Sequence, residues 1–337
     1  MAKRKIIMDV DTGTDDAVAL VLAILGGEVE LLGVTTVNGN LELKLTTDNT
    51  LRVVECCKPY GQVPVYSGCE YPLVSTLSPY SAQSRHPIPK REGTSKKFAM
   101  HRDHLPLPET TLKKQDKNAV VWLIETVMAS EPGSISLVAL APLTNIAAAM
   151  RAEPAFASRL GEIALMGGGD RIGNASAAAE FNILVDPEAA ELVFRSGVPI
   201  TMAGLDVTEK ALIFPEDFER IRALGNPVSD IVAQWLEFFY KFHKSIGYEG
   251  APMHDPCAVM ALPELFESEE LYVAVELSGE YCRGTTVGDR RGQLGHAPNA
   301  RVLFDLDRAG FARLLAEKLL LLEGCTLENG GSLEIEE

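Results

Sequence analysis

The stretch that decides the fold is Ile6-Ile7-Met8-Asp9-Val10-Asp11-Thr12-Gly13-Thr14-Asp15-Asp16-Ala17. A short apolar run ends in carboxylates, Gly13 interrupts it, and a second apolar segment follows at residues 17–25. The first run is typical of a buried strand and the second of a helix. The carboxylates therefore lie where a strand ends and a helix begins, and open α/β sheets bind their ligands at such places.

These four carboxylates fall within eight residues, so they need a counter-charge. Without one, mutual repulsion would raise their pKa values. A bound cation would supply the charge, and Asp oxygens suit a hard ion such as Ca²⁺ or Mg²⁺. A solvated helix N-terminus is the simplest alternative, because carboxylates are favourable against the helix dipole. That alternative accounts for Asp15 and Asp16 but leaves Asp9 and Asp11 unexplained.

Two other motifs share part of this pattern. An EF-hand loop counted from Asp9 would need glycine at Thr14 and glutamate at Leu20, so we reject it. Asp9-Val10-Asp11 also resembles the Asp-x-Asp nucleophile strand of haloacid-dehalogenase-type phosphatases. A phosphatase would leave the Asp15-Asp16 pair without a role, and it therefore remains only an alternative.

Composition limits the possible partners. The chain has 337 residues, 46% of them hydrophobic, and a formal net charge of −16. The length and hydrophobic content are enough for one large core. So acidic a protein repels nucleic acid and anionic membranes, and we expect neither as a partner. No apolar stretch reaches membrane-spanning length without polar or turn residues.

The cysteines indicate a reducing compartment. Six of them are scattered through the chain without a C-x-x-C pair or a recognisable signal peptide. This pattern argues against a zinc site and fits reduced thiols in the cytosol. We therefore expect a cytoplasmic protein.

Strand and helix patterns alternate along most of the chain. Predicted strands lie at residues 5–10, 29–37, 63–66, 135–140, 163–166, 200–203, 271–277 and 302–305, and predicted helices at 15–25, 41–57, 119–129, 228–244 and 308–322. This order favours a single α/β domain with a mostly parallel, Rossmann-like central sheet wrapped by helices. We place that domain at residues 1–325, with a long irregular loop at about 70–117 that is typical of a functional lid or a disordered segment. Residues 326–337 form an acidic tail that we expect to be flexible.

Polar residues recur at the predicted strand ends. Because the carboxyl ends of parallel strands share one edge, these side chains can face one crevice. Carboxylates and amides together suit vicinal hydroxyls and a hard metal ion, which indicates a sugar ligand. The set comprises Asp9, Asp11, Asp15, Asp16, Asn40, Asn174, Glu180, Asn182, His254 and Asp255.

Across residues 4–322 the sequence closely resembles the inosine–uridine nucleoside hydrolase family. The resemblance is specific because many motifs occur in the family's order. Two stretches, residues 221–229 and 250–252, are most similar to the bacterial ribonucleoside hydrolases that prefer pyrimidines. The matching motifs are residues 9–17, Thr35-Thr36-Val37-Asn38-Gly39-Asn40, Pro142-Leu143-Thr144-Asn145-Ile146-Ala147, Met166-Gly167-Gly168-Gly169, Ala179-Glu180-Phe181-Asn182, Val185-Asp186-Pro187-Glu188-Ala189-Ala190, Gly204-Leu205-Asp206-Val207-Thr208 and His254-Asp255-Pro256-Cys257.

The resemblance implies an N-ribohydrolase that converts a nucleoside and water into free base and ribose. It also implies one Ca²⁺ per chain, held by Asp11, Asp16, Asp255 and the main-chain carbonyl of Leu140. Asp11 would also be the general base for the attacking water, while Asp9 is in the motif but structural. The implied substrate-binding residues are Asp15, Asn40, Met166, Asn174, Glu180, Asn182 and His86.

Two histidines compete to protonate the leaving base. His254 matches the family's histidine beside the last metal ligand, and His243 aligns with a histidine of the pyrimidine-preferring members. The chain departs from the family around His86, where His86-Pro87-Ile88-Pro89 replaces the usual His-Gly motif. That loop covers the base in the family, so base specificity stays open. The resemblance further implies a homotetramer or homodimer, and a non-catalytic nucleoside binder is a further alternative.

Overall fold

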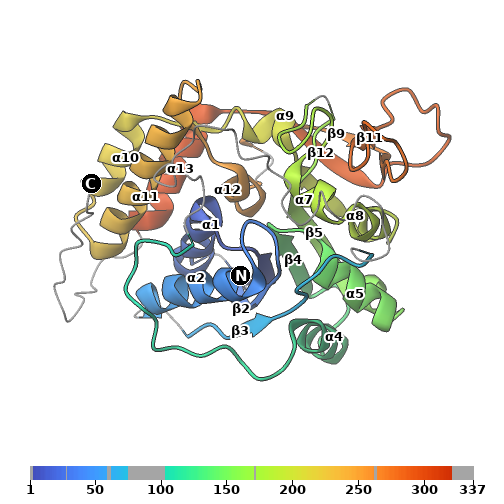
Figure 1. Cartoon of the computed structure of the whole chain (residues 1–337), viewed down its shortest axis with the longest axis horizontal. Coiled ribbons are helices and arrows are strands. Elements are labelled where there is room, and N and C mark those ends of the chain that lie inside the picture. Colours follow the sequence, from blue (N-terminus) through green and yellow to red (C-terminus); the bar gives the residue numbers. More distant parts are fainter. Residues whose placement is uncertain are drawn as a thin grey trace.

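The computed structural model describes residues 3–27, 29–58, 62–74, 103–170, 172–261 and 264–320. His86 and the predicted tail at 326–337 lie outside these residues. The central sheet consists of β1 (Arg4–Val10), β2 (Val29–Thr36), β3 (Val65–Ser67), β4 (Ile135–Ala139), β5 (Leu160–Met166), β6 (Ile200–Ala203), β9 (Phe266–Leu271) and β12 (Ala300–Leu306). Its eight strands follow the order β3-β2-β1-β4-β5-β6-β12-β9 (Figure 1).

The predicted parallel sheet is confirmed. Strand β1 lies inside the sheet between β2 and β4, and Met8 pairs in register with Val34 of β2 and Val138 of β4. Ile6 and Met8 face one core while Ile7 faces the other, and all three are buried. A strand covered on both faces needs a continuous apolar run, which is what this segment offers.

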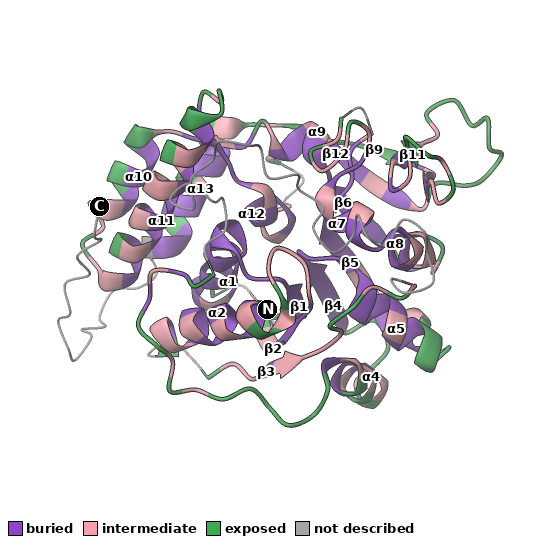
Figure 2. Ribbon diagram, in the orientation of Figure 1, coloured by how far each residue is buried: buried purple, intermediate pink, exposed green. Residues whose placement is uncertain are grey.

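Helices cover both faces of the sheet. One core contains side chains of α1, α2, α11 and α13, and the other contains side chains of α4, α5 and α8. Figure 2 shows the buried residues concentrated in the sheet and in the helix surfaces against it. The helices are α1 (Thr14–Leu25), α2 (Leu43–Cys56), α4 (Ala119–Ala129), α5 (Thr144–Ala152), α6 (Phe156–Arg159), α7 (Phe181–Val185), α8 (Pro187–Phe194), α9 (Leu205–Thr208), α10 (Pro215–Arg222), α11 (Pro227–Ser245), α12 (His254–Val259) and α13 (Arg308–Leu320).

The strand predicted at residues 271–277 is divided between two strands. Instead of a single strand over residues 271–277, the chain ends β9 at Leu271 and starts β10 (Val273–Val275), which pairs antiparallel with β11 (Thr286–Gly288). The break is stabilised because Asn299 Oδ1 accepts a hydrogen bond from the Val273 amide at 2.7 Å. The strand β9 itself pairs antiparallel with β12 at the sheet edge. A second short antiparallel pair joins β7 (Leu212–Ile213) to β8 (Ala251–Pro252).

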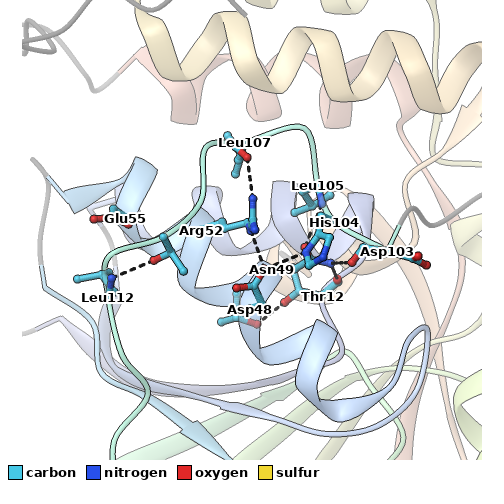
Figure 3. Close-up of polar contacts among 12 residues, drawn as sticks. Thr12, Asp48, Asn49, Arg52, Glu55, Asp103, His104, Leu105, Leu107 and Leu112 are labelled. Carbon is cyan, nitrogen blue, oxygen red and sulfur yellow. Dashed lines mark hydrogen bonds and ion pairs between the residues drawn. The ribbon is translucent and has the colours of Figure 1, made fainter. Parts of the chain in front are cut away.

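The long loop expected at about 70–117 is irregular where the structure describes it. Between residues 103 and 117 it forms no helix or strand, although Gln115 makes an isolated bridge to Tyr66. Side chains of α2 hold it in place: Arg52 Nη1 donates to the Leu107 carbonyl at 2.9 Å (Figure 3). Among the described helices, none combines the length and apolarity needed to cross a membrane.

Candidate active site

The acidic loop, defined as residues 11–16, runs from the end of β1 into the first turn of α1. Asp16 is fully buried and organises the loop through its own carboxylate. Its Oδ1 accepts from the Asp11 amide at 3.2 Å and its Oδ2 from the Gly13 amide at 2.9 Å. The second bond caps the first turn of α1, where a negative charge is favoured by the helix dipole.

The turn after β2 adds further donors to this loop. The Asn40 amide donates to Asp11 Oδ2 at 2.6 Å, and the Asn40 side-chain Nδ2 donates to Asp16 Oδ2 at 3.3 Å. Close approach requires glycine at the preceding position, because a Cβ on Gly39 would lie 1.9 Å from Asp11 Oδ2. The predicted association of Asn40 with the carboxylates is therefore present in the fold.

Helix α12 brings a further carboxylate to the same place. Oxygen atoms of Asp15, Asp16 and Asp255 lie within 4.8 Å of one another, and all three residues are buried. Burial raises the pKa of Asp255 well above its usual range, and the neighbouring charges of Asp15, Asp16 and Asp11 raise it further. Burial also raises the pKa of Asp11, with the charge of Asp16 as the next cause.

This group of carboxylates fits a hard cation. Asp11 Oδ1 and Asp15 Oδ1 are buried and have no hydrogen-bond partner among the described residues. Buried carboxylate oxygens without donors are costly unless a positive charge compensates them. An all-oxygen donor set is the kind that Ca²⁺ or Mg²⁺ prefers. The sequence analysis assigned Asp11, Asp16 and Asp255 to the metal and Asp15 to the sugar, whereas the closely spaced oxygens in the structure belong to Asp15, Asp16 and Asp255. Asp11 is connected to this group because its amide donates to Asp16 Oδ1.

The neighbouring strand ends supply amide and carboxyl groups. Asn182, in the first turn of α7, donates from Nδ2 to the Leu140 carbonyl at 2.9 Å and to the Met166 carbonyl at 3.1 Å. It thereby connects the ends of β4 and β5. Glu180 caps α7 and accepts from the amides of Gly168 at 2.9 Å and Asn182 at 3.0 Å. Burial nevertheless raises the pKa of Glu180 to about 7.

Asn174 occupies a more open position than the other predicted substrate ligands. Its side chain is exposed, and its Oδ1 accepts from the Phe181 amide at 2.9 Å. That bond connects it to the first turn of α7, beside Glu180 and Asn182. Asn174 therefore lies next to the polar groups at the strand ends.

The two histidines occupy different environments. His254 begins α12 directly before Asp255, and its Nδ1 lies 2.8 Å from Thr208 Oγ1. His243 is buried in α11, with Nδ1 2.8 Å from the Phe239 carbonyl and its ring packed against Phe239, Phe242 and Tyr248. Burial lowers the pKa of His243 to about 4, so the ring is neutral at physiological pH. His254 is thus the neighbour of Asp255 in the chain, whereas the described contacts of His243 are with α11 and Tyr248.

Comparison with known proteins decides the family. The family model described as inosine-uridine preferring nucleoside hydrolase matches residues 6–313. The chain belongs to this family. It is therefore a nucleoside hydrolase, an enzyme that cleaves N-glycosyl bonds. The resemblance inferred from the motifs is confirmed, and the phosphatase and non-catalytic binder alternatives are set aside.

Individual relatives cover nearly the whole nucleoside hydrolase. The pyrimidine-specific ribonucleoside hydrolase RihA of Escherichia coli O1:K1 / APEC is 43% identical over 318 residues, covering 93% of this chain and 97% of that protein. Among solved structures, a purine-preferring ribonucleoside hydrolase from Gardnerella vaginalis has a TM-score of 0.81 at 30% identity, covering 94% and 98% of the two chains. A plant nucleoside hydrolase, PpNRh1, has a TM-score of 0.81 at 29% identity, covering 95% and 99%.

Asp9 has a structural environment in this nucleoside hydrolase. Its Oδ1 accepts from Asn145 Nδ2 at 2.8 Å and from the Thr35 hydroxyl. Asn145 Nδ2 also donates to the Thr36 carbonyl at 3.0 Å, so one amide group connects the ends of β1 and β2. The expectation that Asp9 supports the motif agrees with these contacts. Burial raises the pKa of Asp9 to about 7.

No individual role for Asn145 or Thr208 was predicted from the sequence. Both lie in motifs that carried the family resemblance, Pro142-Leu143-Thr144-Asn145-Ile146-Ala147 and Gly204-Leu205-Asp206-Val207-Thr208. Their membership of those motifs was the only signal for them, because a buried Asn or Thr has no distinctive spacing. The structure shows that each holds a charged or ionisable group in place.

Proposed function

We propose that this enzyme hydrolyses ribonucleosides, with a preference for pyrimidines, and uses one Ca²⁺ per chain. The observation that carries the proposal is the buried group of Asp15, Asp16 and Asp255. Asp15 Oδ1, and Asp11 Oδ1 in the same loop, have no hydrogen-bond partner among the residues that the structure describes. The pyrimidine preference is supported by 43% identity to an enzyme named pyrimidine-specific. Residue His86, which we propose contacts the base, lies outside the described residues.

The proposed metal ligands are Asp11, Asp16, Asp255 and the Leu140 carbonyl. Asp15 lies close enough to Asp16 and Asp255 to contribute as well. The Leu140 carbonyl already accepts from Asn182, which fixes its direction and leaves its second lone pair for an ion. When bound, the cation offsets the carboxylate repulsion and lowers the pKa of water beside it.

Asp11 is the proposed general base. Its Oδ2 is held by the Asn40 amide at 2.6 Å, so Oδ1 is the oxygen left to take a proton from the attacking water. Asp15 Oδ1 would accept from a ribose hydroxyl, and Asn40, Met166, Asn174, Glu180 and Asn182 would complete the sugar site. Cleavage of the N-glycosidic bond builds positive charge on the ribose ring, which the surrounding carboxylates stabilise.

The leaving base needs a proton or a hydrogen bond, and we assign this role to His254. Thr208 fixes the orientation of its ring. His243 is the second candidate, but its lowered pKa makes it a poor source of a proton near neutral pH. Separate His254→Ala and His243→Ala variants distinguish the two candidates. Only the variant that lacks the general acid should lose much of its kcat on nucleosides.

A panel of nucleosides tests the proposed function. Uridine, cytidine, inosine and their 2′-deoxy analogues would be incubated with Ca²⁺ and, separately, with a chelator, and free base would be measured by chromatography. We expect metal-dependent release from the ribonucleosides, fastest for uridine and cytidine. Faster release from inosine would overturn the pyrimidine preference, and release that survives exhaustive chelation would overturn the metal assignment.

We also propose that the enzyme is a homotetramer or homodimer in the cytosol. Sedimentation velocity would measure the oligomeric state of the full chain directly. The net charge of −16 argues against nucleic acid or an anionic membrane as a partner.

A further inference from the structure

Helix α2 contacts the acidic loop through a fully buried asparagine. Asn49 Nδ2 donates to the Thr12 carbonyl at 3.2 Å, and Asn49 Oδ1 accepts from the Leu105 amide at 3.0 Å (Figure 3). Nδ2 also lies 3.5 Å from the Asp103 carbonyl. A single side chain therefore binds the acidic loop on one side and the docking segment, defined as residues 103–107, on the other.

The hydrogen bond from Asn49 to Thr12 affects the Gly13 N–H, which donates to the Asp16 carboxylate. In the peptide unit between Thr12 and Gly13, the carbonyl accepts a hydrogen bond from Asn49 Nδ2. The N–H of the same unit donates to Asp16 Oδ2 at 2.9 Å. Because a peptide unit is planar, fixing the direction of the carbonyl also fixes the direction of the N–H. Asn49 therefore sets the orientation of the group that holds Asp16.

Helix α2 also holds the side chain of Thr12. The hydroxyls of Thr12 and Thr50 lie 2.6 Å apart. Since the Thr50 hydroxyl donates to the Thr46 carbonyl at 2.7 Å, the Thr12 hydroxyl is the donor between them. Thr12 is thus held from α2 through both its main chain and its side chain.

We propose that Asn49 is a positioning residue that couples cation binding in the acidic loop to docking of residues 103–107. This inference rests on the metal site of the proposed function. Loss of the Asn49 amide frees the Thr12–Gly13 peptide to rotate, which misdirects the donor to Asp16 and weakens the metal site. Partners of metal ligands commonly change metal affinity about 10- to 100-fold when removed.

The same helix offers a matched control. Asp48 Oδ2 lies 3.0 Å from His104 Nδ1 and also accepts from Arg52, so it holds the same segment (Figure 3). In the described part of the chain, Asp48 makes no hydrogen bond to the acidic loop, whereas its neighbour Asn49 does. Asp48→Asn therefore weakens docking of the segment without disturbing the Thr12–Gly13 peptide.

The first measurement is Ca²⁺ affinity by isothermal titration calorimetry on the full chain. We expect Asn49→Leu and Asn49→Ser to bind Ca²⁺ about 10- to 100-fold more weakly than the wild type. Asp48→Asn should stay within about twofold, because Asn49 still bonds both the Thr12 carbonyl and the Leu105 amide and so keeps the segment docked. Failure of the wild type to bind Ca²⁺ would refute the proposed metal site, whereas equal binding by wild type and both Asn49 variants would refute only this inference.

The second measurement uses the reciprocity of coupled sites. If docking of residues 103–107 favours metal binding, then metal must favour docking by the same factor. Ca²⁺ should therefore slow hydrogen exchange at the Leu105 amide in the wild type and in Asp48→Asn. The Asn49 variants should lose this effect. Exchange at residues 103–107 that is unchanged by Ca²⁺ in the wild type would overturn the coupling, even if the Asn49 variants fail to fold.

Discussion

Thr208 Oγ1 lies 2.8 Å from His254 Nδ1, and the bond joins the end of α9 to the start of α12. Thr208 is fully buried, so the imidazole is attached to a rigid part of the protein. Asp255 follows His254 directly. The first turn of α12 thus carries both His254, the proposed general acid, and Asp255, a carboxylate of the proposed metal site.

Removing the Thr208 hydroxyl should impair protonation of the leaving base. Thr208→Val keeps the shape of the side chain but lets the His254 ring turn, and we expect kcat on nucleosides to fall roughly tenfold with little change in KM. That loss is part of the 10²–10⁴-fold effect typical of general acid catalysis. Steady-state kinetics on uridine would measure it, and Thr208→Ser should restore most of the rate.

A riboside with a good leaving group provides the control for Thr208. p-Nitrophenyl riboside releases an anion that needs no proton, so Thr208→Val should cleave it almost as fast as the wild type. Equal losses on uridine and on this riboside would indicate general damage to the site and contradict a role in orienting His254.

Substituting Gly39 should displace the general base. In Gly39→Ala the new Cβ would lie 1.9 Å from Asp11 Oδ2, so the Asp11 carboxylate or the Asn40 turn must move. A displacement of about 1 Å in a catalytic group can cost 10²-fold, and we expect a loss of that order in kcat/KM. Glu42→Ala, at an exposed side chain just beyond this turn, should keep full activity.

Removing one carboxylate should stabilise the protein in the absence of metal. Asp255→Asn relieves the repulsion from Asp15, Asp16 and Asp11, so we expect its Tm in chelator to exceed that of the wild type by about 2 °C or more. Added Ca²⁺ should raise the Tm of the wild type and have little effect on the variant, because ligand binding stabilises only a fold that holds the ligand.

Calorimetry with and without Ca²⁺ would check this pattern. Asp116→Asn removes an exposed carboxylate and should leave both Tm values unchanged. A wild-type protein that is as stable as Asp255→Asn in chelator would argue that the carboxylates do not strain the fold.

Buried carboxyls also predict how stability varies with pH in chelator. Burial raises the pKa of Glu180 from an ordinary value of 4.5 to about 7, so the folded state keeps a proton that the unfolded state releases. Its stabilising contribution is complete below pH 4.5 and is lost as the pH rises through about 7. Asp9 and Asp15, whose pKa values burial also raises to about 7, act in the same direction.

The Tm in chelator should therefore fall between about pH 5 and pH 8, and Glu180→Gln should make that fall shallower. Glu237→Gln serves as the control: hydrogen bonds from Lys241 and Arg222 lower the pKa of Glu237, so it stays ionised throughout this range. A wild-type Tm that rises steadily from pH 5 to pH 8 would contradict the assignment.

The centre of the fold could be predicted because its strands are apolar and separated by helices. The β1 segment, with Ile6, Ile7 and Met8 buried, is a clear example. The sheet edge was harder to predict. Strand β9 reads Phe266-Glu267-Ser268-Glu269-Glu270-Leu271, and only its first and last residues are buried. Pairing with β12 makes it a strand, and no local pattern in the sequence reveals that partner.

The residues of the candidate site also differ in how far they could be predicted from the sequence. Asp11 and Asp16 were recognisable because clustered carboxylates at a strand end are chemically unusual, whereas Asp255 was assigned through the resemblance to the family. Asn49 and Thr208 were not recognisable, because a polar residue in a helix looks the same whether it faces solvent or holds an active-site group. Their roles come from contacts between segments far apart in the sequence.

Three carboxylates of the proposed metal site come from distant parts of the chain, because Asp15 and Asp16 lie in α1 and Asp255 lies in α12. During synthesis, an emerging chain would therefore carry its acidic loop long before the residue that completes the group. High-affinity binding of the proposed cation would therefore await docking of α12 against α1. Only a chain that contains α12 would then bind the metal tightly. Ca²⁺ should therefore increase resistance to proteolysis in complete chains but not in chains truncated before α12.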